Sequence, residues 1–235
     1  MKYILFTIII LLTNIIQGIT GFAGTVLAMP FSILLLGINI AKPVLNILTI
    51  IACAFIVIKS YKHINISEFI KMTLIMLIGV FIGEYFYSIF SVDVLLIIYA
   101  IFIILISIKG LFVKKQFELN DIVLIAIILI AGIIHGMFIS GGPLLIIYAV
   151  KKLKGKEEFR ATLSPVWIVL NTYILIKQIT VGIINTPILY ITLMAVPALI
   201  IGVFIGNKLA KRISQESFLK LSYILLLISG VSLLI

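Results

Sequence analysis

Apolar residues fill eight long stretches of the chain, and short polar segments separate them. The stretches lie at about residues 3–38, 43–58, 69–90, 94–108, 121–150, 161–176, 186–206 and 217–235. A helix needs ~20 apolar residues to cross the hydrocarbon core of a bilayer, and most of the stretches have about that length. The pattern therefore predicts an all-α protein that crosses a membrane several times, with no loop long enough to fold alone.

The composition of the chain agrees with this pattern. Of its 235 residues, 63% are hydrophobic and 11% are charged, so too few polar side chains remain to cover a soluble domain of this size. The single cysteine, Cys53, has no partner in the chain, which excludes an intramolecular disulfide.

The two halves of the chain share a pattern of glycines and cations. When the sequence is compared with itself at a shift of 118 residues, the coinciding pairs are Gly18 and Gly136, Gly24 and Gly142, Gly37 and Gly155, Lys42 and Arg160, and Lys59 and Lys177. At a shift of 123 residues, the motif IGVFIG at 78–83 coincides with the same motif at 201–206. The sequence therefore predicts two transmembrane repeats, residues 1–112 and 121–235, joined by a cytoplasmic linker at 113–120.

Lysine and arginine residues indicate which way each repeat faces, because they collect in cytoplasmic loops. The segments 59–71 and 151–160 are rich in cations, whereas the equivalent segment of the other half holds one cation in each case. Equivalent loops then lie on opposite sides of the membrane, so the two repeats have inverted topology. Both termini are expected outside, and the cations expected outside are only three of the 18, namely Lys2, Lys42 and Lys177.

The same sidedness requires the apolar stretches 3–38 and 121–150 each to begin and end on one side, as helical hairpins. The expected fold-back points are the glycine-rich segments QGITGFAGT and HGMFISGGP, because glycine permits a tight reversal. Each arm then has about 14–16 residues, or ~21–24 Å, which is shorter than the ~30 Å hydrocarbon core. The predicted fold is two inverted repeats, each a broken hairpin followed by three transmembrane helices; whether the hairpins cross fully or are re-entrant stays open.

Each hairpin has a second helix that restarts near Gly24 or Gly142. The first turn of such a helix has free backbone N–H groups and a partial positive charge, which together bind anions. Two starts that approach from opposite faces could hold a small oxyanion near the bilayer midplane, where transporters built from inverted repeats bind their substrates. The residues expected to contact it are Gln17, Gly21, Gly24, Thr25, Asn46, His135, Ser140, Gly141, Gly142, Ser164 and Asn171. The alternative for the glycines is close helix packing, which is the favoured interpretation for IGVFIG.

Two ionisable residues, His135 and Glu84, are candidates for proton coupling. The charge of a histidine changes near neutral pH, and a carboxylate inside an apolar stretch is costly enough to indicate function. Each residue also has a structural interpretation. His135 could hold the fold-back through one hydrogen bond, and Glu84 could lie at the membrane interface.

The sequence indicates no metal, cofactor or nucleotide. It has neither an H-E-x-x-H helix nor a P-loop of the form G-x-x-x-x-G-K-[ST]. The net charge of +10 comes from loops beside membrane spans, which explains it without a nucleic acid. The expected partners are a small anionic substrate and membrane lipids, and a homodimer is one assembly that the sequence leaves open.

These features together resemble the TauE/SafE family of bacterial and archaeal permeases. The resemblance rests on a glycine-rich turn near the start of each half, on the basic residue that follows it (Lys42, and FRATLS at 159–164), and on IGVFIG before a basic loop. It implies a secondary exporter of small anions such as sulfite or organosulfonates in a prokaryotic plasma membrane, with the substrate between the fold-backs and near Asn46 and Ser164. The chain departs from the family motif at Pro143, where a further glycine is common.

Three other functions stay open from the sequence. An enzyme would have to rely on His135 alone for its chemistry. A lipid-phosphate flippase or scramblase could also use paired hairpins, but it needs a polar groove open to lipid rather than a closed central pocket. An anion channel would conduct without saturating. For a transporter the expected mechanism is alternating access, in which the two repeats rock against each other around the pocket.

Overall fold

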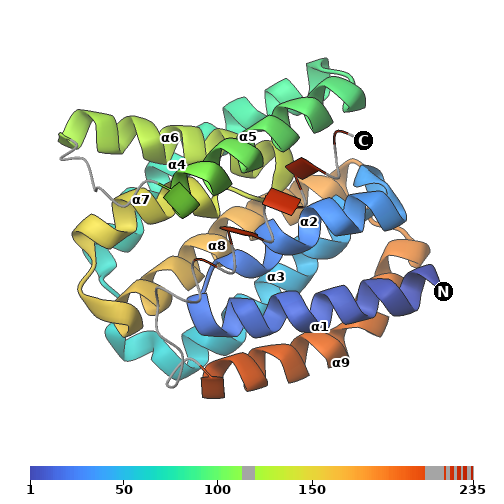
Figure 1. Cartoon of the computed structure of the whole chain (residues 1–235), viewed down its shortest axis with the longest axis horizontal. Coiled ribbons are helices and arrows are strands. Elements are labelled where there is room, and N and C mark those ends of the chain that lie inside the picture. The colour runs from blue at the N-terminus through green and yellow to red at the C-terminus, as the bar shows by residue number, and fades with distance from the viewer. Residues whose placement is uncertain are drawn as a thin grey trace.

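The computed structural model describes residues 1–112, 120–209 and isolated positions between 220 and 234. In the described residues the chain forms α1 (Lys2–Thr20), α2 (Ala23–Leu36), α3 (Ile38–Ser60), the 3₁₀-helix η1 (Tyr61–His63), α4 (Ile66–Ile89), α5 (Val92–Phe112), α6 (Asp121–Phe138), α7 (Gly142–Lys152), α8 (Gly155–Thr180) and α9 (Thr186–Leu209) (Figure 1). Seven of these helical segments are long and apolar enough to cross a membrane. The prediction of an all-α polytopic membrane protein is therefore confirmed.

The order of elements follows the predicted repeats as far as the described residues reach. The α1–α2 hairpin is followed by α3, α4 and α5, and the α6–α7 hairpin is followed by α8 and α9. The expected last helix at 217–235 and the linker at 113–120 lie largely outside the described residues. Of the linker only Asn120 is described, and its side chain caps α6 by accepting a hydrogen bond from Val123 N at 2.9 Å. The division into two domains stays a prediction.

Both hairpins break within the glycine-rich segments, as predicted. At the first break Gly21 has a left-handed backbone with φ of 83°, and its N–H donates to Gln17 O at 2.7 Å. At the second break Ile139 has φ of 55°, and its N–H donates to His135 O at 2.7 Å. Residues 21 and 139 are equivalent at the shift of 118, so the two breaks have the same geometry.

The expectation that a glycine makes each reversal is wrong for the second break. Ile139 takes the left-handed conformation there, although a β-branched residue is a steric outlier in that region. Such a conformation costs roughly 1–3 kcal/mol and persists only when its surroundings impose it. The side chain of Ile139 is 2% exposed and belongs to the main hydrophobic core, so burial offsets the backbone cost.

The predicted arm length of about 14–16 residues holds for α2 but is wrong for α7, which is shorter, and for both first arms, which are longer. Helices α1 and α6 have 19 and 18 residues, or about 27–29 Å at ~1.5 Å per residue. They are longer than expected because they continue as helix through Gly18 and Gly136, which pack against neighbouring helices instead of starting the turn. Helices α2 and α7 have 14 and 11 residues and are the short arms.

The glycines of both halves let helix backbones touch. A Cβ atom built on Gly79 would lie 2.3 Å from Leu129 O, and one built on Gly202 would lie 2.6 Å from Leu11 O. The same holds for Gly18, whose Cβ would lie 2.7 Å from Val203 O, and for Gly136, whose Cβ would lie 2.5 Å from Val80 O. The packing interpretation of IGVFIG is confirmed, since no side chain fits at these contacts.

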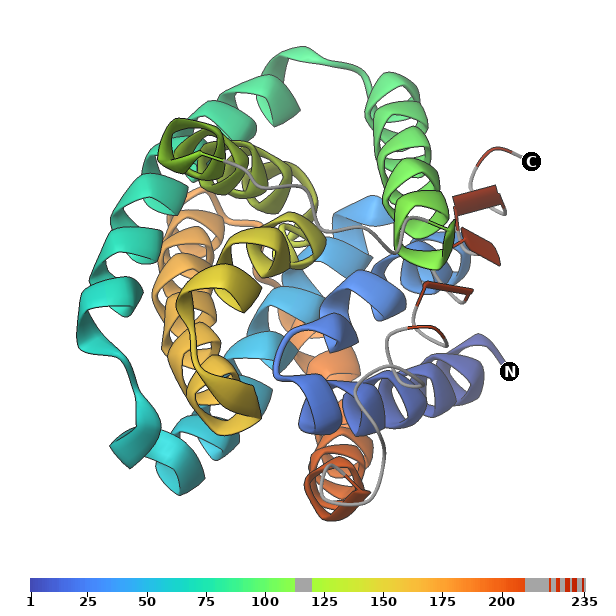
Figure 2. The same cartoon turned by 60° about the vertical axis from the view of Figure 1, so that its left-hand side comes forward.

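These glycine contacts pair helices from different halves of the chain. Helix α1 packs along α9, α6 packs along α4, and α3 packs against α8. The short arms α2 and α7 lie between the α1–α9 pair and the α4–α6 pair (Figure 2). The pairs Gly18 and Gly136, Gly79 and Gly202, and Gly83 and Gly206 each meet equivalent residues, so the two halves pack on each other reciprocally at these contacts.

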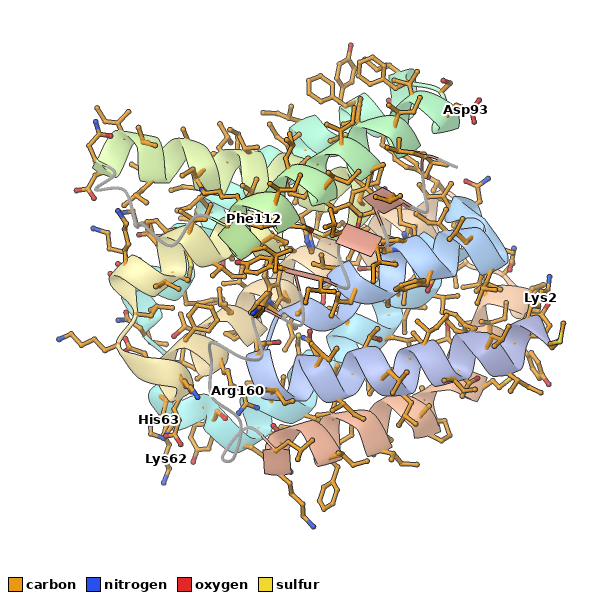
Figure 3. All side chains as sticks on the ribbon, in the orientation of Figure 1. Lys2, Lys62, His63, Asp93, Phe112 and Arg160 are labelled. Atoms are coloured by element: carbon orange, nitrogen blue, oxygen red, sulfur yellow. The ribbon has the colours of Figure 1, made fainter. Side chains whose placement is uncertain are left out.

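Charged side chains lie at two opposite ends of the molecule, as expected for a protein that exposes both ends to water. Lys62 and His63 lie at one end, whereas Lys2 and Asp93 lie at the other (Figure 3). Helix α1 begins at the right of Figure 1 and α6 begins at the left. This arrangement supports inverted repeats, although the inverted relation itself stays a prediction.

Two cations that the sequence places in loops lie instead in helices. Helix α3 begins at Ile38 and α8 begins at Gly155, so Lys42 and Arg160 belong to the early turns of these helices. Both helices start at glycines with positive φ, or directly after one, and then continue through the polar segment. An apolar pattern marks only the membrane-embedded part of a helix, which explains why the polar first turns were read as loops.

Candidate functional site

The starts of α2 and α7 touch in the interior of the protein. A Cβ atom built on Gly142 would lie 3.4 Å from Phe22 O and 3.5 Å from Val26 Cγ2. These are ordinary van der Waals distances, so the two helix starts are in direct contact. The structure thus brings together the two helix starts, those of α2 and α7, at which the sequence analysis predicted an anion site.

On the side of the first break, buried polar groups form the Gln17 cluster: Asn14, Gln17, Gly24, Thr25 and Thr49. Gln17 Oε1 accepts a hydrogen bond from Gly24 N at 2.7 Å, and Gln17 Nε2 lies 3.6 Å from Cys53 Sγ. The hydroxyls of Thr25 and Thr49 bond to each other. A cavity of about 10 Å³ lies against the cluster, which is room for about one water molecule.

The start of α2 is already occupied by hydrogen bonds from its own chain. Gln17 takes the N–H of Gly24, and Thr20 Oγ1 accepts from Ala23 N at 3.3 Å. The expectation of free N–H groups at this start is therefore wrong for this conformation. An anion can reach the first turn of α2 only if the Gln17 side chain moves away.

The start of α7 is built differently. Gly141 at its N-cap has no side-chain cap, and Pro143 in the first turn has no N–H to offer. Ser140 is fully buried, and its hydroxyl donates to Phe138 O at 2.9 Å and accepts from Tyr99 OH at 2.8 Å. Ser140 therefore braces the second break against α5, through a tyrosine that the sequence did not single out.

On the side of the second break, a further set of buried polar groups forms the His135 cluster: Asn46, His135, Trp167, Asn171 and Gln178. The His135 ring is 2% exposed and stacks on Trp167, with 5.1 Å between ring centroids. Asn46 Nδ2 donates to Asn171 O at 3.2 Å and to Gln178 Oε1 at 3.0 Å. Helices α3, α6 and α8 thus bring His135, Asn46 and Asn171 together, as the predicted site requires.

Most polar atoms of the His135 cluster lack a hydrogen bond among the described residues. They are both ring nitrogens of His135, which interact with the Asn171 side chain without a hydrogen bond of normal geometry, the indole N–H of Trp167, and the Oδ1 atoms of Asn46 and Asn171. A buried polar atom without a partner costs about 1–3 kcal/mol, and such atoms are rare in proteins. Five of the eight such side-chain atoms among the described residues belong to this cluster.

Lys42 is the residue beside this cluster that the sequence analysis missed. Its side chain is 7% exposed, and its ammonium donates to Gly136 O at 2.9 Å and lies 3.5 Å from the centroid of the Tyr87 ring. A cationic side chain therefore lies beside the neutral groups of the His135 cluster. The sequence feature that could have revealed Lys42 is its spacing of four residues from Asn46, which puts both residues on one face of a helix.

Glu84 lies in an ion pair. Its Oε2 accepts from Lys177 Nζ at 2.8 Å and from Tyr173 OH at 3.1 Å. The side chain of Glu84 is 11% exposed, and that of Lys177 is 50% exposed. The pair closes one end of the protein next to Lys42, and the suggested role of Glu84 in proton coupling stays a prediction.

Two of the predicted substrate-binding residues, Ser164 and Gly21, contact other parts of the protein. Ser164 Oγ donates to Arg160 O at 2.8 Å, within its own helix. Gly21 packs against Arg160, whose Cα and Cγ would each lie 3.2 Å from a Cβ built on Gly21. The Arg160 guanidinium in turn donates to Asn207 Oδ1. These groups lie beside the first break rather than in the His135 cluster.

Comparisons with known proteins agree with this architecture. The sequence profile of the family described as "Sulfite exporter TauE/SafE" matches residues 6–233. The chain is also similar to a probable inner membrane transporter protein TsaS from Comamonas testosteroni, with 30% identity over 105 residues. That match covers 44% of this chain and 44% of the relative, so less than half of the relative is represented. No solved structure matches the chain.

Proposed function

Because the chain belongs to the TauE/SafE sulfite exporter family, we propose that it is a secondary transporter that exports a small oxyanion, such as sulfite or an organosulfonate, across a prokaryotic plasma membrane. The family description supplies the substrate class. The seven apolar helices and the name of the inner membrane relative support the location.

The observation that carries this proposal is the contact between the starts of α2 and α7 beside unpartnered buried donors. A helix start concentrates N–H groups and a partial positive charge. Two starts in contact, with Trp167 N–H and the His135 ring close to the second break, form a place where negative charge is favoured. Such a site discriminates in favour of an oxyanion, because an uncharged solute can accept hydrogen bonds from the donors but carries no charge for the helix dipoles to stabilise.

The site is closed in this conformation. The cavity at the Gln17 cluster has room for about one water, whereas sulfite has four heavy atoms. Transport therefore requires the starts of α2 and α7 to separate and Gln17 to release Gly24. Alternating access provides this separation, and the reciprocal packing of the two halves supports it, since a motion that opens one end can be repeated at the other.

Export needs no nucleotide. An inside-negative membrane potential favours the exit of an anion by ~2.3 kcal/mol per charge per 100 mV. Coupling to protons through His135 or Glu84 is therefore an addition to this driving force rather than a requirement.

The burial of the polar clusters favours a small anion over a lipid headgroup. His135, Asn171 and Gln17 are almost fully buried, so they do not line a groove that is open to lipid. A flippase or scramblase must keep part of its substrate in the bilayer during passage, which requires such a groove. Scrambling of a labelled phospholipid is therefore measured as the competing outcome in the transport experiment.

The test is efflux from proteoliposomes. The purified protein is reconstituted, the vesicles are loaded with sulfite, and efflux is followed at an imposed inside-negative potential, with protein-free vesicles as the control. We expect saturable efflux that also exchanges external for internal sulfite. Absence of efflux for sulfite and several sulfonates, together with scrambling of a labelled phospholipid, would overturn the proposal, and conductive flux without exchange would indicate a channel.

A further inference from the structure

Three charged groups face one another near one end of the protein, and their charges do not cancel. Glu84 on α4 and Lys177 on α8 both act electrostatically on Lys42 of α3. The Glu84 carboxylate is engaged by Lys177 and Tyr173, and Lys42 makes no ion pair with any residue in the described ranges. Two cations and one carboxylate leave a net charge of +1, and the buried member is Lys42.

The Lys42 ammonium is held in place but does not use all of its N–H donors in hydrogen bonds. An ammonium has three N–H donors; one reaches Gly136 O, and the face of Tyr87 lies against the group. A buried charge without a counter-ion is expensive. Membrane proteins keep such charges where they bind ions or substrates.

The ammonium lies next to the unpartnered atoms of the His135 cluster. The carbonyl that it bonds belongs to Gly136, the residue after His135, and Asn46 follows Lys42 by one helical turn on the same face of α3. His135 and Trp167 are more than nine-tenths buried and stack on each other. In the described part of the chain their ring nitrogens make no hydrogen bond of normal geometry, and the Asn171 side chain is the group that interacts with the imidazole. A cation and two further nitrogen groups therefore converge from α3, α6 and α8.

We propose that Lys42, His135 and Trp167 bind the negatively charged group of the substrate. This inference rests on the proposed function and names the residues that recognise the charge. Lys42 supplies the positive charge, and the imidazole and indole N–H groups donate to separate oxygens of the sulfite or sulfonate. The Glu84–Lys177 pair covers this site from one end, and its carboxylate competes with the substrate for the two lysines.

A purely structural role for Lys42 is the alternative. Gly136 lies in the last turn of α6, where a lysine can bond a free carbonyl and offset the helix dipole. Arg160 is the equivalent residue of the other half and has a similar place beside the end of α1, with its guanidinium bonded to Asn207. It is a demanding control, because its Nε–H is also buried without a partner.

The first experiment compares anion-dependent stabilisation in variants. The Tm of purified protein is measured against sulfite concentration at constant pH and ionic strength for the wild type, Lys42→Gln, Lys42→Arg and Arg160→Gln. We expect Lys42→Gln to need at least about tenfold more sulfite for the same rise in Tm, because a hydrogen bond to a charged group is lost. Lys42→Arg and Arg160→Gln should keep a midpoint near that of the wild type, even if Arg160→Gln melts at a lower temperature without sulfite.

The second experiment needs no substitution and serves if Lys42→Gln does not fold. Trp167 is the single tryptophan of the chain, so its fluorescence reports on the proposed site alone. Sulfite and methanesulfonate should change the emission saturably at the concentrations that raise Tm, whereas uncharged dimethyl sulfone should not.

The outcomes separate this inference from the proposed function. If neither Tm nor efflux of the wild type responds to any anion, the proposed function fails. If the wild type responds but Lys42→Gln has the same midpoint, or Lys42→Gln and Arg160→Gln lose the response equally, the assignment to Lys42 is overturned while the transporter stands. An emission of Trp167 that stays constant while Tm rises would likewise place the anion elsewhere.

Discussion

Gln17 and His135 occupy equivalent positions before the two breaks, yet their hydrogen bonding is opposite. Gln17 caps the start of α2 through Gly24, whereas the ring nitrogens of His135 make no hydrogen bond of normal geometry in the described residues. The difference follows from their neighbours, because Thr49 in one half corresponds to the bulky Trp167 in the other. The sequence predicted that both residues lie at the breaks, but it could not show which of them is satisfied, since that depends on packing between helices far apart in the chain.

Substitution of the two residues should therefore have opposite consequences for stability. Gln17→Leu removes a buried acceptor from Gly24 N–H and should lower the stability by about 1–3 kcal/mol. His135→Phe keeps a ring against Trp167 and removes only unpartnered nitrogens, so its Tm should stay close to that of the wild type while sulfite efflux falls. Thermal unfolding of both variants in one detergent is the measurement. A larger loss of Tm in His135→Phe than in Gln17→Leu would show that the imidazole is bonded after all.

Glu84 offers a prediction about affinity. Glu84→Gln removes the carboxylate that engages Lys177 at 2.8 Å and raises the net charge around Lys42 from +1 to +2. We expect sulfite to half-saturate the variant at a lower concentration than the wild type, with a weaker effect at high salt because Lys177 is half-exposed.

Concentration dependence of efflux at two ionic strengths measures this effect. Lys2→Gln is the matched control, since it removes an exposed charge remote from the site. A half-saturating concentration that is unchanged or higher in Glu84→Gln would contradict the account. Loss of the dependence on a pH gradient in the same variant would support proton transfer through Glu84.

At the scale of the elements, the sequence predicted that both hairpins are broken, but it did not predict at which residue each one reverses. The glycine-rich segments predicted both breaks, because few other residues in this chain tolerate a reversal. The position of the reversal within each segment was not predictable, since Gly18 and Gly136 serve close packing and the buried Ile139 serves as the left-handed residue. The sequence also predicted loops at Lys42 and Arg160, which lie in helices. Apolar residues show which part of a helix is embedded in the membrane, and the helix itself can extend into polar residues beyond that part.

The first break should be sensitive to a single methyl group. Gly21→Ala places a Cβ in a left-handed position, which costs roughly 1–2 kcal/mol, and brings it 3.2 Å from the backbone and side chain of Arg160. Gly182→Ala has a similar φ of 74° but no atom within 4 Å of the new Cβ, so it pays only the backbone cost. We expect a lower Tm for Gly21→Ala than for Gly182→Ala. Equal values would mean that the contact with Arg160 does not restrain the break.

At the scale of the whole molecule, the packing defines which parts can move together. The α1–α9 and α4–α6 pairs each join helices from both halves through backbone contacts at glycines. A motion that rocks one repeat against the other would break these contacts, because each contact joins a helix of one repeat to a helix of the other. We therefore expect the two interleaved pairs to move as units, with α2 and α7 separating between them (Figure 2).

The most direct test of this account is a reversible cross-link between the starts of α2 and α7. Val26→Cys and Gly142→Cys are combined in a Cys53→Ala background, because the side chain of Val26 reaches the Cβ position of Gly142, with its Cγ2 atom 3.5 Å away, and a disulfide needs two side chains in such proximity. Efflux of methanesulfonate is measured after oxidation and again after reduction, because sulfite itself cleaves disulfides, with each single cysteine variant as a control. The account predicts that oxidation stops efflux and that reduction restores it. Efflux at an unchanged rate in the fully oxidised protein would contradict it, since the substrate would then cross without the two helix starts moving apart.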